Sequence, residues 1–447
     1  MTDYAFVLGK NWVLSLAELV VCLQDRGIAD RVKDYSRTAA IVESQQKLSD
    51  EQLVDIQSAL GGCYKVGRVV SVYDRALVEE AFPARGKVQK PARKMIQEIP
   101  WVKRVWPRPR GARIKFGVST YPLLNRQTSV DLRKFTLAMD EWVKKRLVEL
   151  GAKKAAYYAY EGPDRRDAKR INVALWPQTI ARRGLLSPPN AEILALLTEG
   201  SLYLAKTVGV YDSQLQQFRD EARPYISAEI STSPKMCRIL LNLAGARPGD
   251  TVLDPFCGSG TLLMEAAMLG MKCRGIDINS EAAEGARANL KWLGSEMGDW
   301  IDFKIIKGDA RQASALLGQQ VDAVAFEPDL GPVYRETPSV EDAKRSIDAL
   351  TVLYREVLDD LGSCLRPGGR VGMTVPVVNT DNGQVSVDIN TMIEGTGFDI
   401  LKLLNSDAFK DYSPRNQRLS VKTDRTTLPE RKRGQIVQRA VVMLGRI

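Results

Sequence analysis

The stretch Val252-Leu-Asp-Pro-Phe-Cys-Gly-Ser-Gly-Thr-Leu-Leu-Met264 joins an apolar strand to a glycine-rich turn and then to a helix with an apolar face. Gly258 and Gly260 permit a tight turn whose backbone can approach a ligand closely. The amino end of the following helix favours polar or anionic groups. This order predicts a doubly wound α/β domain with a cofactor pocket at the end of the strand.

A second strand, Lys272–Ile278, supports a nucleotide-containing cofactor. It ends in Asp277, about 20 residues after the glycines, where a carboxylate can reach a ribose diol. Dinucleotide dehydrogenases use the same arrangement, but their turn requires a third small residue where this chain has Leu263. The turn therefore argues against a dehydrogenase and leaves other α/β nucleotide-binding folds open.

The motif Asp254-Pro-Phe-Cys-Gly-Ser-Gly-Thr261 resembles the corresponding motif of class I methyltransferases that use S-adenosyl-L-methionine. The resemblance implies that Asp254 lies near the ammonium group of the cofactor, Asp277 near its ribose and Asp309 beside its adenine. The residues implied to bind the cofactor are Asp254, Phe256, Cys257, Gly258, Gly260, Thr261, Asp277, Ile278, Asp309 and Ala310.

Further segments are similar to the THUMP-domain tRNA guanosine N2-methyltransferases. They are the block 231–244 with Arg219-Asp220 and Arg223-Pro224 upstream, the opening strand and helix 4–20, and the closing strand 435–444. The resemblance implies methylation of the exocyclic N2 amine of a guanosine, most readily in tRNA. It implies a ferredoxin-like α+β domain (1–60), a THUMP RNA-binding domain (61–211), a linker (212–230) and a Rossmann-like methyltransferase domain (231–447).

The loop after the fourth strand departs from that family. The family carries Asp/Asn-Pro-Pro-Tyr/Phe, and this chain reads Glu327-Pro-Asp-Leu-Gly331. An exocyclic amine is a poor nucleophile, so a side-chain oxygen and a backbone carbonyl must orient it while a ring stacks on the base. The resemblance assigns those roles to Glu327, Pro328, Asp329, Leu330 and Tyr334, whereas a structural reading gives this loop a shaping role only.

Positive charge is concentrated in the first half of the chain. Residues 1–220 hold 36 of the 64 Lys and Arg residues but 24 of the 54 Asp and Glu residues. Basic runs beside aromatic residues and prolines are typical of a phosphate-binding surface, and a solvated basic face is the alternative. The predicted RNA-binding residues are Arg108, Arg110, Arg113, Lys115, Arg165, Arg166, Arg182 and Arg183.

Composition bounds the remaining chemistry. The chain has no histidine, so a proton acceptor must be a carboxylate, the substrate or water. The six cysteines form no Cys-x-x-Cys pair, so we expect buried thiols and no metal site. The chain shows no apolar run of 18 or more residues and no basic segment leading into an apolar core. We therefore expect a cytoplasmic protein without a membrane partner, and the sequence leaves a small activator subunit open.

The hydrophobic patterns predict strands at 5–8, 38–41, 113–119, 155–159 and 170–175, and helices at 14–24, 50–60, 129–150 and 194–205. They also predict a charged linker at 212–223 and a mobile loop at 422–433. Three other functions stay open: a catalytically altered or inactive RNA-binding protein of the same fold, a DNA amino-methyltransferase, and a dehydrogenase, against which the glycine turn argues.

Overall fold

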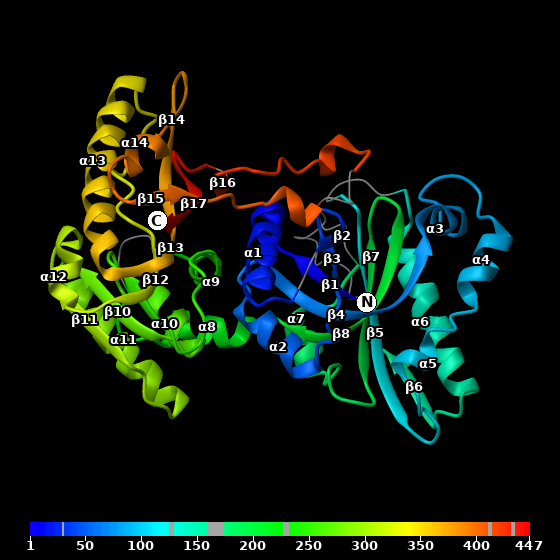
Figure 1. The fold of residues 1–447 in the computed structure, drawn as a ribbon. Helices are drawn as coiled ribbons and strands as arrows, with labels where there is room; N and C mark the ends of the chain where they lie inside the picture. Colours follow the sequence, from blue (N-terminus) through cyan, green and yellow to red (C-terminus); the bar gives the residue numbers. More distant parts are fainter. Residues whose placement is uncertain (29–30, 125–128, 160–172, 227–231, 410–413, 431–433) are drawn as a thin grey trace.

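The computed structural model contains two β-sheets, one in each half of the chain (Figure 1). It describes residues 1–28, 31–124, 129–159, 173–226, 232–409, 414–430 and 434–447. Within these ranges, every helix is too short or too polar to cross a membrane. The predicted RNA-binding residues Arg165 and Arg166 lie outside the described residues.

The N-terminal sheet has eight described strands in the order β2-β3-β1-β4-β8-β7-β5-β6. The strands are β1 Thr2–Leu8, β2 Arg31–Tyr35, β3 Ala39–Ser44, β4 Cys63–Asp74, β5 Arg113–Tyr121, β6 Lys154–Tyr157, β7 Ala191–Leu197 and β8 Ser201–Val210. The helices are α1 Trp12–Asp25, α2 Asp50–Ala59, α3 Arg75–Ala81, α4 Lys90–Gln97, α5 Val102–Val105, α6 Leu132–Glu149 and α7 Pro177–Arg182. Because β4 pairs with both β1 and β8, the predicted boundary near residue 60 falls within one continuous sheet.

The predicted helix at 194–205 is wrong, because this segment forms the hairpin of β7 and β8. All seven residues of β7 are buried. A strand that is buried on both faces shows no alternation of apolar and polar residues, so periodicity could not distinguish it from a buried helix. The side chain of Thr198 closes the turn by accepting the Ser201 N–H at 3.2 Å.

The predicted charged linker at 212–223 contains a helix, α8 Ser213–Ala222. Asp212 caps its first turn. Arg219 is buried and forms an ion pair of 2.6 Å with Glu265, which also binds Arg238 at 2.5 Å. Paired buried arginines look like solvated charges in a sequence, because their partner lies elsewhere in the chain.

The C-terminal sheet has the order β11-β10-β9-β12-β13-β17-β15, with β14 paired to β13 and β16 to β17. The strands are β9 Thr251–Asp254, β10 Lys272–Asp277, β11 Phe303–Lys307, β12 Val321–Phe326, β13 Leu365–Thr380, β14 Gly383–Ser386, β15 Phe398–Ile400, β16 Thr427–Glu430 and β17 Val437–Arg446. The helices are α9 Pro234–Leu243, α10 Thr261–Met268, α11 Ser280–Met297, α12 Ala313–Leu317, α13 Val340–Cys364 and α14 Ile389–Ile393.

Strands β9 to β13 of this sheet are parallel, and β17 joins them in the antiparallel direction. The chain reverses its order between β9 and β12, so the carboxyl ends of these strands flank the topological switch point where such sheets bind ligands. The doubly wound domain predicted from the sequence is confirmed. Part of the predicted loop at 422–433 is instead strand β16.

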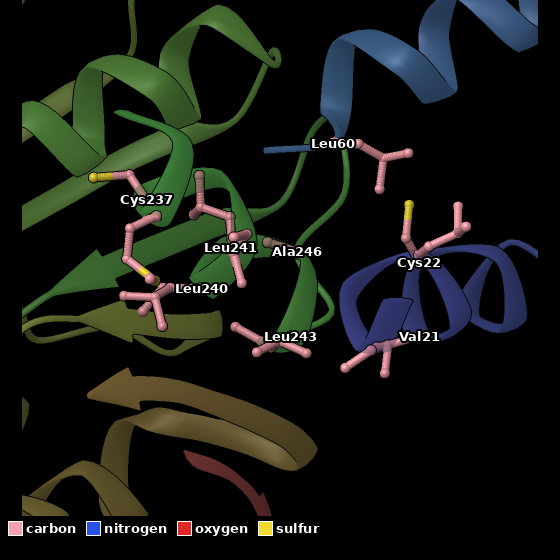
Figure 2. Packing of buried hydrophobic residues seen from close by; sticks show 14 of the residues in the cluster. Val21, Cys22, Leu60, Cys237, Leu240, Leu241, Leu243 and Ala246 are labelled. Atoms are coloured by element: carbon pink, nitrogen blue, oxygen red, sulfur yellow. The ribbon is translucent and has the colours of Figure 1, made fainter. Parts of the chain in front are cut away.

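The two halves of the protein share a hydrophobic core. Val21 and Cys22 of α1 belong to the same hydrophobic cluster as Leu240 and Leu243 of α9, and Figure 2 shows this cluster from close by. The six cysteines are buried and unpaired, as predicted.

Glu18 makes one of the polar contacts between the halves, and the Arg370–Asp25 ion pair is another. Glu18 is fully buried and accepts hydrogen bonds from Asn242 of α9 and from the N–H groups of Gly61 and Gly62, at 2.7–2.8 Å. The apolar core and the contacts of Glu18 together hold α9, which precedes β9, against the N-terminal half.

Candidate active site

The glycine turn connects β9 to α10 in the left-handed conformation that its residues require. Gly258 has φ +49° and Gly260 has φ +79°. A Cβ atom on Gly260 would lie 3.1 Å from the Ala286 side chain, whereas one on Gly258 would meet nothing within 4 Å. Gly260 is therefore needed for packing against α11 as well as for its backbone, and Gly258 faces open space beside the turn.

The Asp254 side chain is buried at the end of β9, where it accepts the Phe256 N–H at 3.0 Å. Burial raises the pKa of Asp254 well above its usual range, against the lowering effect of that hydrogen bond. The nearby charges of Asp277 and Glu327 raise it further. Three acids from three neighbouring strands thus converge, which suits a cationic ligand that could pair with the buried carboxylate.

Asp277 connects the second strand to the glycine turn. One of its carboxylate oxygens accepts the Gly258 N–H at 2.8 Å and the other accepts the Asn279 N–H at 2.8 Å. Beside it, the Ile278 side chain is 71 % exposed. A carboxylate next to an exposed apolar side chain can accept from a sugar diol while the apolar surface contacts a flat ring.

The other predicted cofactor residues support the same turn. The Cys257 N–H donates to the Ile276 carbonyl at 2.9 Å. The Thr261 hydroxyl oxygen accepts from the Arg223 guanidinium at 2.8 Å. Phe256 stacks on Phe326 of β12 with ring centroids 5.5 Å apart.

Asp309, after the third strand, is engaged by an arginine that sequence reasoning missed. Its carboxylate lies 2.6 Å from the Arg311 guanidinium, and the hydrogen bonds from Arg311 lower the pKa of Asp309. Ala310 beside it is buried. The contact of Asp309 with adenine stays a prediction. If Asp309 makes that contact, it would do so while paired with Arg311.

Glu327, directly after β12, is held by two strands that follow it in the chain. The Arg439 Nη2 donates to Glu327 Oε1 at 2.8 Å, and Arg439 Nε lies 2.5 Å from Oε2. The Thr374 hydroxyl donates to Oε2 at 3.3 Å. The side chains of Glu327 and Arg439 are only 11 % and 8 % exposed. Sequence reasoning missed Arg439, whose one signal is a charge inside the apolar strand β17.

The rest of this loop is anchored on α13. The Tyr354 hydroxyl donates to the Asp329 carbonyl, and the Asp329 carboxylate accepts the Gly331 N–H at 2.9 Å. Tyr334 is partly buried, and its hydroxyl donates to Ser346 at 3.0 Å. Leu330 is partly exposed and Pro328 is buried. The contacts of Tyr334 fix its ring on the α13 side of the loop.

The predicted RNA-binding residues that the structure describes lie on the N-terminal half and are exposed: Arg108, Arg110, Arg113, Lys115, Arg182 and Arg183. Arg113 of β5 pairs in register with Lys154 of β6. Lys154 therefore lies beside the basic residues at the start of β5, although the sequence did not single it out. Arg183, directly after α7, lies over the ring of Tyr158, 4.9 Å from its centroid. Their binding of RNA stays a prediction.

The strand order, the glycine turn and the acids at the strand ends define an α/β domain of the class I methyltransferase fold. Residues 223–380 match the model of the RMKL-like methyltransferase domain, and residues 89–288 match that of the N6/N4 DNA methylases. TrmN from Thermus thermophilus has a similar fold, with a TM-score of 0.50 and 16% identity over 100% of both chains.

Among curated proteins, the chain is similar to archaeal enzymes named tRNA (guanine(10)-N2)-dimethyltransferase. It is 33% identical to that of Methanothermobacter thermautotrophicus over 48% of this chain and 59% of the relative. It is 29% identical to that of Methanocaldococcus jannaschii over 40% of this chain and 49% of the relative. The chain thus spans about half the length of these relatives, and the resemblance inferred from the motifs is confirmed for the matched part. The THUMP assignment stays a prediction.

Proposed function

We propose that this protein is an S-adenosylmethionine-dependent RNA methyltransferase that modifies the exocyclic N2 amine of a guanosine, with tRNA as the substrate. The observation that carries the proposal is the convergence of Asp254, Asp277 and Glu327 at the carboxyl ends of β9, β10 and β12. The similarity to tRNA guanine N2-methyltransferases supports it.

The residues at the glycine turn fit a cofactor that is both cationic and nucleoside-like. Asp254 would face its positive charge, Asp277 its ribose, and Ile278 its adenine ring. When bound, S-adenosylmethionine supplies an electrophilic methyl group attached to a sulfonium. Methyl transfer from such a group needs alignment and desolvation more than strong acid or base catalysis, so the absence of histidine is no obstacle.

On the acceptor side, Glu327 would accept one N–H of the amine and the Pro328 carbonyl the other. This pair of acceptors would turn the nitrogen toward the methyl group, and the Glu327 carboxylate would receive the proton that the amine loses. Leu330 lies in the same loop and offers an apolar contact to the base, and Tyr334 would add a ring at the edge. Asp329 is the other carboxylate of the loop and is exposed.

The basic N-terminal half would bind the RNA backbone. Exposed arginines and lysines lie at the start of β5 and at the end of α7, and that half carries the positive net charge of the chain, while the catalytic half carries almost no net charge. In this arrangement the N-terminal half would bind the RNA and the C-terminal half would transfer the methyl group. A cytoplasmic location accords with this substrate.

The test is methyl transfer by the purified protein, measured with labelled S-adenosylmethionine on bulk tRNA and on duplex DNA of equal nucleotide concentration. We expect labelled tRNA, with N2-methylguanosine identified by mass spectrometry of the digested nucleosides. Label in DNA alone would establish the second candidate, an amino-methyltransferase of DNA, which the match of residues 89–288 favours. RNA binding without any transfer would establish an inactive RNA-binding protein of this fold.

A further inference from the structure

We propose that Arg439 is the positioning residue of the acceptor site: it fixes the Glu327 carboxylate in one orientation and so determines where the substrate amine lies. This inference rests on the proposed function. It assigns a role to a residue that lies 112 positions away from Glu327 in the chain.

Arg439 lies in the interior of the C-terminal sheet, where few conformations are available to it. Strand β17 pairs with β13 on one side and with β16 on the other, and Arg439 stands in register with Pro376 and with Glu430. Its guanidinium contacts two carboxylates: Glu327 through Nη2 and Nε, and Glu430 through Nη1 at 3.4 Å. Because the guanidinium is planar and contacts Glu327 on one side and Glu430 on the other, its orientation is fixed.

The contacts leave Glu327 little freedom to accept a further hydrogen bond. An ionised carboxylate has about four lone-pair directions, and Arg439 and Thr374 engage both of its oxygens. The direction left over is the one available to an amine N–H. Because a guanidinium stays protonated, Glu327 remains an acceptor beside it, and a donor such as an amine is the group that fits.

The same contacts account for the departure of this loop from the Asp/Asn-Pro-Pro-Tyr/Phe pattern. A glutamate side chain is one methylene longer than an aspartate and has one more rotatable bond. Its carboxylate oxygens can therefore occupy more positions. The hydrogen bond from Arg439 Nη2 to Oε1 and the close approach of Nε to Oε2 limit that freedom. Glu327 and Arg439 therefore act as one unit, in which the longer acid reaches the arginine and the arginine holds it in place.

The experiment compares Arg439→Gln, Arg439→Lys and the control Glu430→Gln, which touches Arg439 but not Glu327. Calorimetric titration with S-adenosylmethionine verifies that each variant is folded and binds the cofactor like the wild type. We expect kcat for methyl transfer to fall roughly ten- to hundredfold in Arg439→Gln, because the acceptor is present but misaligned. Lysine supplies charge without the fork, so Arg439→Lys should recover less than half of that loss.

A second measurement separates positioning from a merely structural role. If Arg439 orients the Glu327 carboxylate, Arg439→Gln should lower kcat while the KM values for RNA and for S-adenosylmethionine stay near those of the wild type. Glu430→Gln, whose amide oxygen can still accept from Arg439, should keep both constants near those of the wild type. A residue that only supported the fold would lower stability and leave the kcat of the folded molecules unchanged.

The outcomes distinguish this inference from the proposed function. An unchanged kcat in folded Arg439→Gln would overturn the positioning role and leave the methyltransferase intact. A wild type without turnover on any RNA would overturn both. Urea unfolding of Glu327→Gln, Arg439→Gln and the double variant tests the contact itself, and additive shifts of the midpoint would show that the two side chains do not interact.

Discussion

The two sides of the candidate active site are built in different ways. On the cofactor side, Asp254, Gly258 and Asp277 belong to two successive strand–helix units and meet through hydrogen bonds over short stretches of chain. On the acceptor side, Glu327 meets Arg439 across 112 residues. The cofactor side therefore follows from local sequence, whereas the acceptor side depends on the closing strand of the sheet. Changes on one side should accordingly leave the other side working.

The largest effect is expected for Glu327→Gln. Glutamine keeps an oxygen of similar reach but loses the charge that holds Arg439, so methyl transfer should fall by roughly ten- to a thousandfold. Affinities for S-adenosylmethionine and RNA should stay near those of the wild type. Single-turnover assays and calorimetry measure the two quantities separately.

The matched control for that variant is Asp329→Asn, which makes the same change of charge in the same loop on an exposed side chain. It should retain most of the activity. Robust turnover in Glu327→Ala would contradict the assignment of the amine acceptor, and loss of activity in Asp329→Asn would move that role to Asp329.

The cofactor side is tested by Asp277→Ala. The change removes the proposed acceptor of the ribose diol and the partner of the Gly258 N–H, which should cost about 1–3 kcal/mol, or roughly tenfold to a hundredfold in affinity for S-adenosylmethionine. RNA affinity should not change. Unchanged calorimetric binding by a folded variant would remove Asp277 from the site, and Asp348→Ala, on the exposed face of α13, serves as the control.

The contrast between the two sides also explains how far the sequence could predict this structure. The glycine turn and the acids after the first strands obey rules that operate within about 20 residues, and the turn was located correctly. Arg439 could not be paired with Glu327 because no local rule links β12 to β17. The same reason hid the Arg219–Glu265 ion pair, which anchors the otherwise largely exposed helix α8 in a segment that looks like a charged linker.

The basic half should affect neither side of the site directly. Replacing Arg108, Arg110 and Arg113 together by glutamine should lower RNA affinity roughly tenfold at moderate salt and flatten the dependence of log affinity on log salt by about 0.7–0.9 for each lost phosphate contact. Cofactor binding should be intact. Filter binding over a salt series measures the slope, with Lys304, Lys344 and Arg345 replaced together as a control of equal charge on the catalytic half. Equal slopes for the wild type and the triple arginine variant would mean that these arginines are solvated and do not contact RNA.

The smallest effect concerns the attachment of the cofactor side to the N-terminal half. Burial raises the pKa of Glu18 from 4.5 to about 7, against the hydrogen bonds from Gly61, Asn242 and Gly62. A carboxyl whose pKa is raised on folding stabilises the fold fully below its unfolded pKa and loses that contribution as pH rises through the folded pKa. The wild type should therefore lose a part of its stability between about pH 4.5 and about pH 7 that Glu18→Gln, whose amide oxygen still accepts hydrogen bonds, does not lose. Thermal unfolding of both proteins at pH 5 and pH 8 measures the difference, and parallel changes in their midpoints would mean that Glu18 does not titrate in this range.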